Sequence, residues 1–125
     1  MYRAQQTMHT KTMTGRSRKL PLIGSKDPSL RKKGLRQAFN TAIQASCADF
    51  FKQVGIRAVA YAPRGIDYRF VVFDSFLLEV PEGMEAEEYI KVAEELSDFS
   101  DQFPGLKFGF SIAEGNTWLE AYDKV

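Results

Sequence analysis

The side chains in this sequence that are best suited to bind phosphate are concentrated near its N-terminus. Residues 11–36 contain nine Lys or Arg residues and one carboxylate, that of Asp27. Each Lys or Arg can neutralise one phosphate of a nucleic acid and release a counterion. Residues 1–40 carry a net charge of +9 and residues 41–125 carry −8, although the net charge of the 125-residue chain is only +1. This asymmetry is typical of an interaction segment joined to a folded body.

Side chains that could perform catalysis are few. The single histidine, His9, falls outside every predicted helix and strand, which argues against a nucleophile–histidine relay and against a His-rich metal site. The single cysteine, Cys47, rules out an intramolecular disulfide and falls beside the apolar stripe of a predicted helix. Buried cysteines usually act as small hydrophobes, so we expect a packed thiol and not a reactive one. The sequence therefore predicts a protein that is not an enzyme and holds no metal or cofactor.

A second set of candidate phosphate contacts follows the first predicted helix. It consists of Arg57, Arg64 and Arg69, with Tyr61 and Tyr68 nearby in the sequence. An arginine beside an aromatic ring can bind phosphate or stack on a base. The simpler interpretation is that these are ordinary residues of a turn and a strand surface. No phosphate loop is present, because the nearby glycines lack the required spacing and the helix that must follow.

Carboxylates gather on the outer face of a helix that we predict for residues 84–103. The members of this acidic docking face are Glu87, Glu88, Glu94, Glu95 and Asp98. Carboxylates that act as acid and base need burial or a close partner to separate their pKa values. Because these lie on the polar face of an amphipathic helix, we expect a solvated surface or a docking surface.

The elements that must position these residues follow from the hydrophobic periodicity. Residues 1–26 keep neither the period of a strand nor that of a helix, so we expect a basic arm that is disordered unless bound. Residues 27–125 are predicted to form one domain. Asp27 and Pro28 predict the start of a helix, and Gly55 predicts its end. Gly34 should weaken this helix by roughly 1 kcal/mol relative to Ala.

Alternating apolar residues predict strands in the remainder of the chain, at 56–62, 66–73, 76–80, 106–112 and 117–122. With the helix at 84–103, the order is α-β-β-(β)-α-β-β. The predicted fold class is α+β, in two layers. An antiparallel sheet of four or five strands packs two helices on one face, and the basic arm precedes it.

Three functions compete to explain the arm. A transit peptide accounts for the lack of acidic residues before Asp27, but no amphipathic helical stripe is present. Nucleic-acid binding accounts for the charge, although the arm lacks interleaved aromatic residues and the remaining chain is acidic. Assembly accounts for both halves, because a basic arm with an apolar segment could dock on the acidic helix of a neighbouring subunit. The predicted partner-binding residues are Arg16, Arg18, Lys19, Leu20, Leu22, Ile23, Arg31, Lys32 and Lys33.

We therefore predict a non-enzymatic protein that binds other protein subunits in a homo-oligomer or a larger assembly. By analogy, a viral or phage structural component would carry such an arm. The alternative is a nucleic-acid-associated or inhibitory protein that contacts phosphates through the arm, Arg57, Arg64 and Arg69, or mimics nucleic acid with its acidic helix. No apolar run could span a bilayer and no secretory signal is present. The expected location is the cytoplasm or a virion, with organellar targeting left open.

Overall fold

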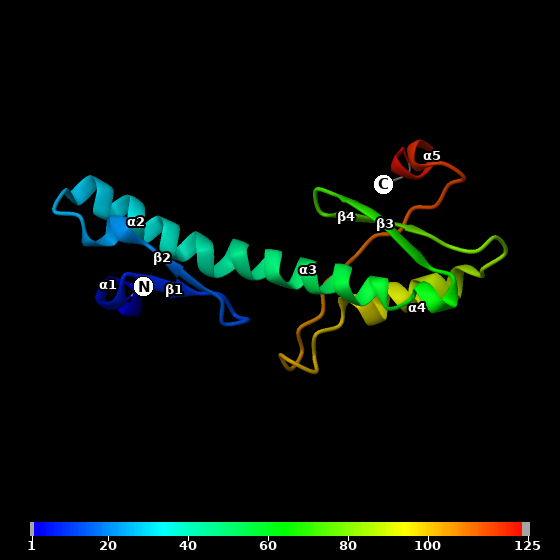
Figure 1. The fold of residues 1–125 in the computed structure, drawn as a ribbon, viewed down its shortest axis with the longest axis horizontal. Helices are drawn as coiled ribbons and strands as arrows, with labels where there is room; N and C mark the ends of the chain where they lie inside the picture. The colour runs from blue at the N-terminus through cyan, green and yellow to red at the C-terminus, as the bar shows by residue number, and fades with distance from the viewer. Residues whose placement is uncertain (1, 124–125) are drawn as a thin grey trace. The chain divides into compact units, whose positions relative to one another are not determined.

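The computed structural model describes residues 2–123, and for residues 2 and 3 the backbone alone. The chain divides into two compact units, Met1–Gln53 and Val54–Val125, hereafter the N-terminal and C-terminal units (Figure 1). This division differs from the predicted one at residue 26. Each unit has a cluster of buried apolar side chains of its own.

The N-terminal unit consists of short elements packed against the start of a long helical segment (Figure 1). Its elements are α1 (Tyr2–Thr7), β1 (His9–Lys11), β2 (Ser17–Lys19), the 3-10 helix η1 (Pro21–Gly24), α2 (Pro28–Asn40) and the π-helical segment η2 (Thr41–Ala45). Helix α3 (Ser46–Val59) begins in this unit and ends in the C-terminal unit.

Residues 2–26, within the predicted arm, are folded onto their own chain. Leu20, 1% exposed, and Ile23, 5% exposed, form a buried cluster with Ala4 and Ala38. Leu35 of α2 packs against this cluster. Burial of these side chains offsets the entropy of ordering the segment, which composition alone did not account for.

At Gly34 the backbone of η1 lies close against α2. A Cβ atom there would lie 2.8 Å from the backbone nitrogen of Ile23 and 2.9 Å from the carbonyl carbon of Leu22. Real Cβ atoms do not approach backbone so closely, so only glycine fits without displacing η1. The glycine that the sequence marks as a weak point of the helix is therefore a packing requirement.

The start of the long helical segment is confirmed, and its end is corrected. The carboxylate of Asp27 accepts a hydrogen bond from the backbone N–H of Ser29 at 2.7 Å, as expected of an N-cap. The helix passes through Gly55 and ends at Val59, so the strand predicted at 56–62 is wrong. Helical spacing brings Ala58 into the core of the C-terminal unit with Val54 and Tyr61.

The C-terminal unit contains a hairpin and two further helices (Figure 1). Its elements are the 3-10 helix η3 (Ala62–Arg64), β3 (Asp67–Val72), β4 (Ser75–Glu79), α4 (Ala86–Ser97) and α5 (Trp118–Tyr122). Strands β3 and β4 are antiparallel, with Asp67 opposite Glu79 and Val72 opposite Ser75. Ala58, Ile66, Val92 and Leu96 form the buried cluster.

The predicted four- or five-stranded sheet is not found between residues 2 and 123. Two separate two-stranded antiparallel sheets are present instead, β1–β2 and β3–β4. Residues 106–112, predicted as a strand, instead contain an isolated β-bridge, between Lys107 and Asp98. Residues 117–122, predicted as a strand, contain α5, because Thr117 caps the helix by accepting a hydrogen bond from the backbone N–H of Glu120.

Across residues 2–123, no helix has both the length and the apolar character that a membrane span requires.

Substitution of Gly34 by Ala tests the close approach of η1 to α2. We expect Gly34→Ala to lower the free energy of unfolding by about 1–3 kcal/mol, because the displacement of η1 outweighs the gain in helix propensity. Urea denaturation of the full chain measures the change. Gly109→Ala is the control, since a Cβ there meets nothing within 4 Å. A stabilisation by Gly34→Ala would contradict the packing requirement.

Candidate nucleic-acid interface

The hairpin of β1 and β2 presents two different faces. His9 lies opposite Lys19, Thr10 opposite Arg18 and Lys11 opposite Ser17. Thr10 and Arg18 face the helical segment: the guanidinium of Arg18 donates to Thr41 Oγ1 at 2.9 Å, and Thr10 Oγ1 donates to the carbonyl of Ala38 at 3.5 Å. Because side chains alternate along a strand, His9, Lys11, Ser17 and Lys19 form the opposite face, which we call the outer face of the hairpin. All four are exposed.

The loop between the two strands, residues 12–16, is bound to α3 by a carboxylate. Asp49 accepts hydrogen bonds from Thr14 Oγ1 at 2.7 Å and from Arg16 Nε at 2.8 Å, and its Oδ1 lies 2.7 Å from Arg16 Nη2. The backbone N–H of Met13 donates to Ser46 Oγ at 2.9 Å, and Arg16 Nη2 also donates to the carbonyl of Ala45. The loop is therefore held on one side of the helical segment by Ala45, Ser46 and Asp49.

The environment of Asp49 favours its charged form. The hydrogen bond from Arg16 is the main cause that lowers the pKa of this carboxyl from 3.8 to about 2, and the hydrogen bond from Thr14 adds to it. Asp49 is therefore ionised throughout the neutral range, and its side chain is only 11% exposed.

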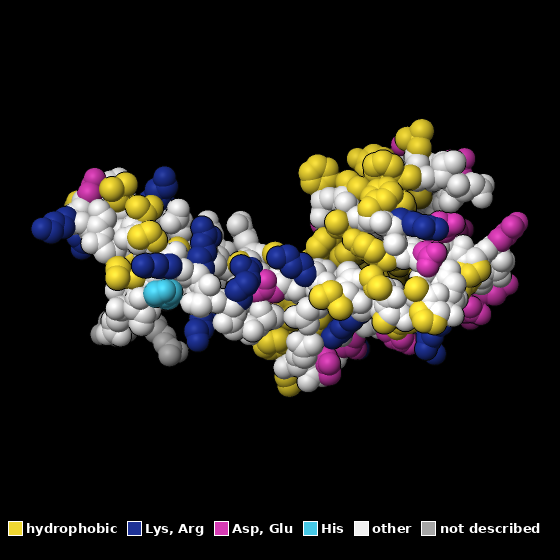
Figure 2. Space-filling model, in the orientation of Figure 1, with side chains coloured by type: hydrophobic (Ala, Val, Ile, Leu, Met, Phe, Trp, Pro, Cys, Tyr) yellow, Lys and Arg dark blue, Asp and Glu magenta, His cyan; other side chains and the backbone are white. Residues whose placement is uncertain are grey.

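The N-terminal unit carries far more positive than negative charge. It has eleven Lys or Arg residues and two carboxylates, a net charge of +9. Both carboxylates serve the fold, because Asp27 caps α2 and Asp49 binds the loop. Within the described part of the chain, these exposed cations have no ion pair: Lys11, Arg18, Lys19, Lys26, Arg31, Lys32, Lys33 and Arg36. Figure 2 shows Lys and Arg side chains over this unit on the face drawn.

The structure places the predicted partner-binding residues in two environments. Arg18, Lys19, Arg31, Lys32 and Lys33 are exposed, whereas Leu20 and Ile23 are buried in the core of their own unit. Leu22 is partly buried beside them. The apolar part of the predicted docking segment thus belongs to the core of the N-terminal unit.

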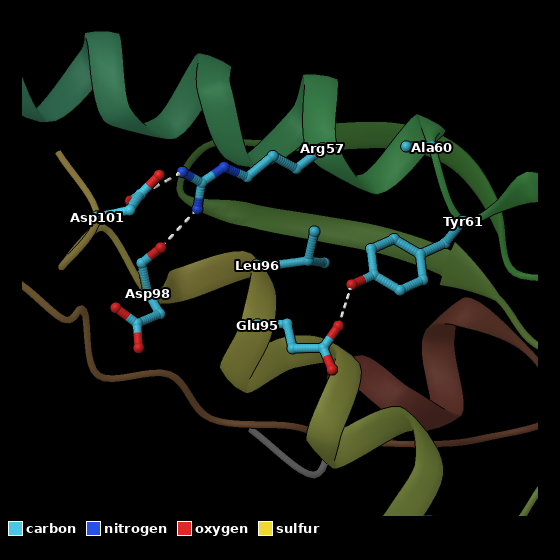
Figure 3. Close-up of a pocket in the computed structure, with 7 residues that line it drawn as sticks. All are labelled: Arg57, Ala60, Tyr61, Glu95, Leu96, Asp98 and Asp101. Atoms are coloured by element: carbon cyan, nitrogen blue, oxygen red, sulfur yellow. Dashed lines mark hydrogen bonds and ion pairs between the residues drawn. The ribbon is translucent and has the colours of Figure 1, made fainter.

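Arg57, a predicted phosphate contact, lines an open pocket of about 430 Å³ in the C-terminal unit (Figure 3). Its guanidinium donates to the carbonyl oxygen of Asp98 at 2.6 Å, lies 3.7 Å from the carboxylate of Asp101 and stacks over the ring of Phe99. In the same pocket the hydroxyl of Tyr61 donates to the carboxylate of Glu95. The pocket is lined by three acidic residues, so it is unsuited to phosphate.

Arg64 and Arg69 also have partners within the C-terminal unit. The guanidinium of Arg64 lies over the ring of Tyr61, 5.1 Å from its centre. Arg69 donates to Glu79 at 2.6 Å and lies 3.5 Å from a carboxylate oxygen of Asp67. This unit has six Lys or Arg residues and fourteen carboxylates, a net charge of −8. The geometry therefore favours the N-terminal unit as the phosphate-binding surface.

The predicted acidic docking face is partly engaged inside its own unit. Glu87, Glu88 and Glu94 are exposed on α4, whereas Glu95 is bound by Tyr61. Asp98 lies beyond the end of α4 and pairs with Lys107 at 2.8 Å. The hydrogen bond from Lys107, with further bonds from Ser100, holds the pKa of Asp98 well below its usual range.

Sequence reasoning missed three features of this structure. Cys47 is exposed and not packed as expected, because the buried side of α3 carries Ser46 and Phe50 instead. Asp49 was not singled out, although it is one of only two carboxylates among the first 53 residues. At the turn between β3 and β4, Phe73 is 96% exposed with a φ of 53°, a conformation that is unusual for an aromatic residue.

The pH dependence of stability tests the bond between Asp49 and the loop. Because folding lowers the pKa of Asp49, its charge stabilises the native state above pH 3.8 and this contribution is lost as the pH falls to about 2. We expect Asp49→Asn to be less stable than the wild type at pH 7 and the two unfolding curves to converge near pH 2. Lys52→Gln is the control, because it removes a charged side chain from the same helix and leaves the bonds of Asp49 in place. An equal gap at both pH values would show that the charge of Asp49 does not hold the loop.

Comparisons with known proteins identify the family of this chain. Residues 1–120 match the model of DNA polymerase family A. The thermostable DNA polymerase I of Thermus filiformis is 30% identical over 115 residues, and that of Thermus thermophilus is 30% identical over 118 residues. Each match covers 90% of this chain and 13% of the relative, so the chain spans about an eighth of the length of these relatives.

A solved structure agrees with these relatives. It is the POL domain of Pol1 from M. smegmatis, in complex with DNA primer-template and dNTP. The match has a TM-score of 0.75 at 30% identity and covers 97% of this chain and 22% of that one.

These matches overturn the function predicted from the sequence. The expectations of a non-enzymatic assembly protein and of a viral or phage structural component are wrong, because the relatives are DNA polymerases. The nucleic-acid alternative agrees better with these relatives. The chain belongs to DNA polymerase family A.

Proposed function

We propose that this chain takes part in DNA synthesis by a DNA polymerase of family A, and that its N-terminal unit binds the phosphate backbone of primer–template DNA. Membership of the family supports the first part of this proposal. The relative from M. smegmatis, whose structure holds a DNA primer-template and dNTP, supports the second.

One observation carries the assignment to the N-terminal unit, namely its excess of unpaired positive charge. Its net charge is +9, and both of its carboxylates are engaged in structural hydrogen bonds. Phosphate contacts supply most of the affinity of a protein for DNA of any sequence, and they fix its register on the duplex. A polymerase must bind every sequence that it copies, so backbone contacts suit this function.

Two groups of cations in this unit are candidates for these contacts. The first is the outer face of the hairpin, with Lys11 and Lys19 on neighbouring strands. The second is on α2, where Lys32 and Arg36 are four residues apart and therefore share a side of the helix. The C-terminal unit, with a net charge of −8, would repel a phosphate backbone and is assigned no such contact.

Polymerases commonly use two divalent metal ions to stabilise the attacking and leaving oxygens. Among residues 2–123, no group of three or more His, Cys, Asp or Glu side chains is placed to hold a metal ion. The residues described here do not provide a complete metal site, so we derive no metal-dependent step from this chain.

The salt dependence of DNA binding tests the proposed surface. We expect the full chain to bind a primer–template duplex with an affinity that falls steeply as salt rises. Replacing Lys32 by Gln should reduce the slope of log affinity against log salt by about 0.9, because one phosphate contact is lost. Fluorescence anisotropy across a salt series measures both quantities.

The matched control is Lys91→Gln, which removes an exposed lysine from α4 of the C-terminal unit. Its salt slope should equal that of the wild type. A chain that binds no duplex at low salt, or an equal effect per lysine removed in the two units, would refute the assignment of DNA binding to the N-terminal unit.

A further inference from the structure

We propose that Asp49 is a positioning residue for DNA binding, because it fixes the β1–β2 hairpin on α3 and so holds Lys11 and Lys19 as a preformed pair of phosphate contacts. This inference rests on the proposed function and names a residue that acts through the hairpin and not on the DNA itself.

The hairpin needs an external support to keep one conformation. Each of its strands has only three residues, and its outer face is exposed. An isolated two-stranded hairpin is marginally stable at best in water. Its bonds to the helical segment therefore decide whether Lys11 and Lys19 are held in place.

Asp49 supplies the strongest of these bonds. Its two carboxylate oxygens accept from Thr14 and from Arg16, so one side chain ties the middle and the end of the loop to α3. Hydrogen bonds to an ionised carboxylate are roughly twice as strong as bonds between neutral groups. Thr12, 6% exposed, completes the loop by accepting from the backbone N–H of Arg16 at 3.0 Å and bonding Thr14 Oγ1 at 3.0 Å.

This arrangement removes Arg16 from the set of DNA-binding cations. Its guanidinium is engaged by Asp49 and by the carbonyl of Ala45, so its charge serves the fold. Lys11 and Lys19 have no such partner among residues 2–123 and lie diagonally on the outer face of the hairpin. A preformed pair spares the complex the entropy of ordering the hairpin when DNA binds.

The direction in which Asp49→Asn changes the affinity for DNA separates this proposal from a simple effect of net charge. Removing a carboxylate from a basic DNA-binding unit should tighten its binding if only net charge matters. Asp49→Asn and Asp27→Asn raise the net charge of the N-terminal unit by the same amount. Asn is as good an N-cap as Asp, so Asp27→Asn leaves α2 capped. The proposal requires the two variants to change affinity in opposite directions.

The test measures binding of the full 125-residue chain to a fluorescent primer–template duplex at low salt. We expect Asp49→Asn to bind roughly tenfold more weakly than the wild type, which corresponds to the loss of about one charge-assisted contact. Asp27→Asn should bind as tightly as the wild type or more tightly. Asp49→Glu, which keeps the charge and the acceptor oxygens, should restore part of the loss.

A double-mutant cycle provides a readout that general destabilisation would not move. In the wild type, Lys19→Gln should reduce the salt slope by about 0.9, the value for one phosphate contact. In the Asp49→Asn background the same substitution should reduce it by much less, because Lys19 is no longer held in place. Equal reductions in both backgrounds would overturn the proposal, even if Asp49→Asn binds weakly.

The outcomes distinguish this inference from the proposed function. If the wild type binds no duplex, the proposed function fails. If the wild type binds with a steep salt slope and Asp49→Asn binds as tightly as Asp27→Asn, the role of Asp49 alone is refuted. Should Asp49→Asn fail to fold by circular dichroism, Thr14→Val decides, since it removes only one of the bonds to Asp49. Unchanged DNA binding by Thr14→Val would then overturn the proposal.

Discussion

Burial of Leu20 and Ile23 against α2 is the contact on which the N-terminal unit depends. Burying an aliphatic side chain of this size stabilises a fold by about 1.5–3 kcal/mol, and here it orders a segment that is otherwise polar and charged. The contact requires Gly34, because any side chain there would displace η1. Once this segment is packed, β1 and β2 are brought to the helical segment, and the cations that they carry become a surface of defined geometry.

The charge of that surface is costly to the fold, and the same charge is what suits it to the proposed DNA binding. Eleven cations and two carboxylates in one compact unit repel one another, and a protein selected for stability alone would pair more of them. The N-terminal unit instead uses its two carboxylates for a helix cap and for the loop, and leaves the other cations without ion pairs among the described residues. DNA would supply the missing negative charge, so binding should relieve the repulsion as counterions are released.

The sequence supports those parts of the fold that depend on neighbouring residues. Asp27 and Pro28 predict the start of α2 correctly, because capping is local. The strand predicted at 56–62 is wrong because the same apolar residues fit a helix when Ala58 packs among residues far away in the sequence. The strand predicted at 117–122 is wrong because Thr117 and Glu120 form a local helix cap, which outweighs the alternation of apolar residues.

Only part of the candidate site could be predicted from the sequence. The excess of positive charge is visible in the sequence, but the pairing of Arg16 with Asp49, 33 residues apart, requires the fold. Charge also does not reveal which negative partner it meets, so a protein surface and a phosphate backbone could not be distinguished. Composition does not reveal the similarity to DNA polymerases, and this similarity supports the proposal of a phosphate backbone.

The π-helical segment η2 explains why the loop and the helical segment fit together. A π-helix places residues five apart above one another, whereas an α-helix does so for residues three or four apart. Thr41 and Ser46 are therefore aligned across η2, and Asp49 follows three residues later on the same side. These three side chains bind Arg18, the backbone of Met13 and Arg16, respectively. The π-helical turn thus places Thr41, Ser46 and Asp49 on the side of the helical segment that binds the hairpin. Through the hairpin, it also sets the positions of Lys11 and Lys19.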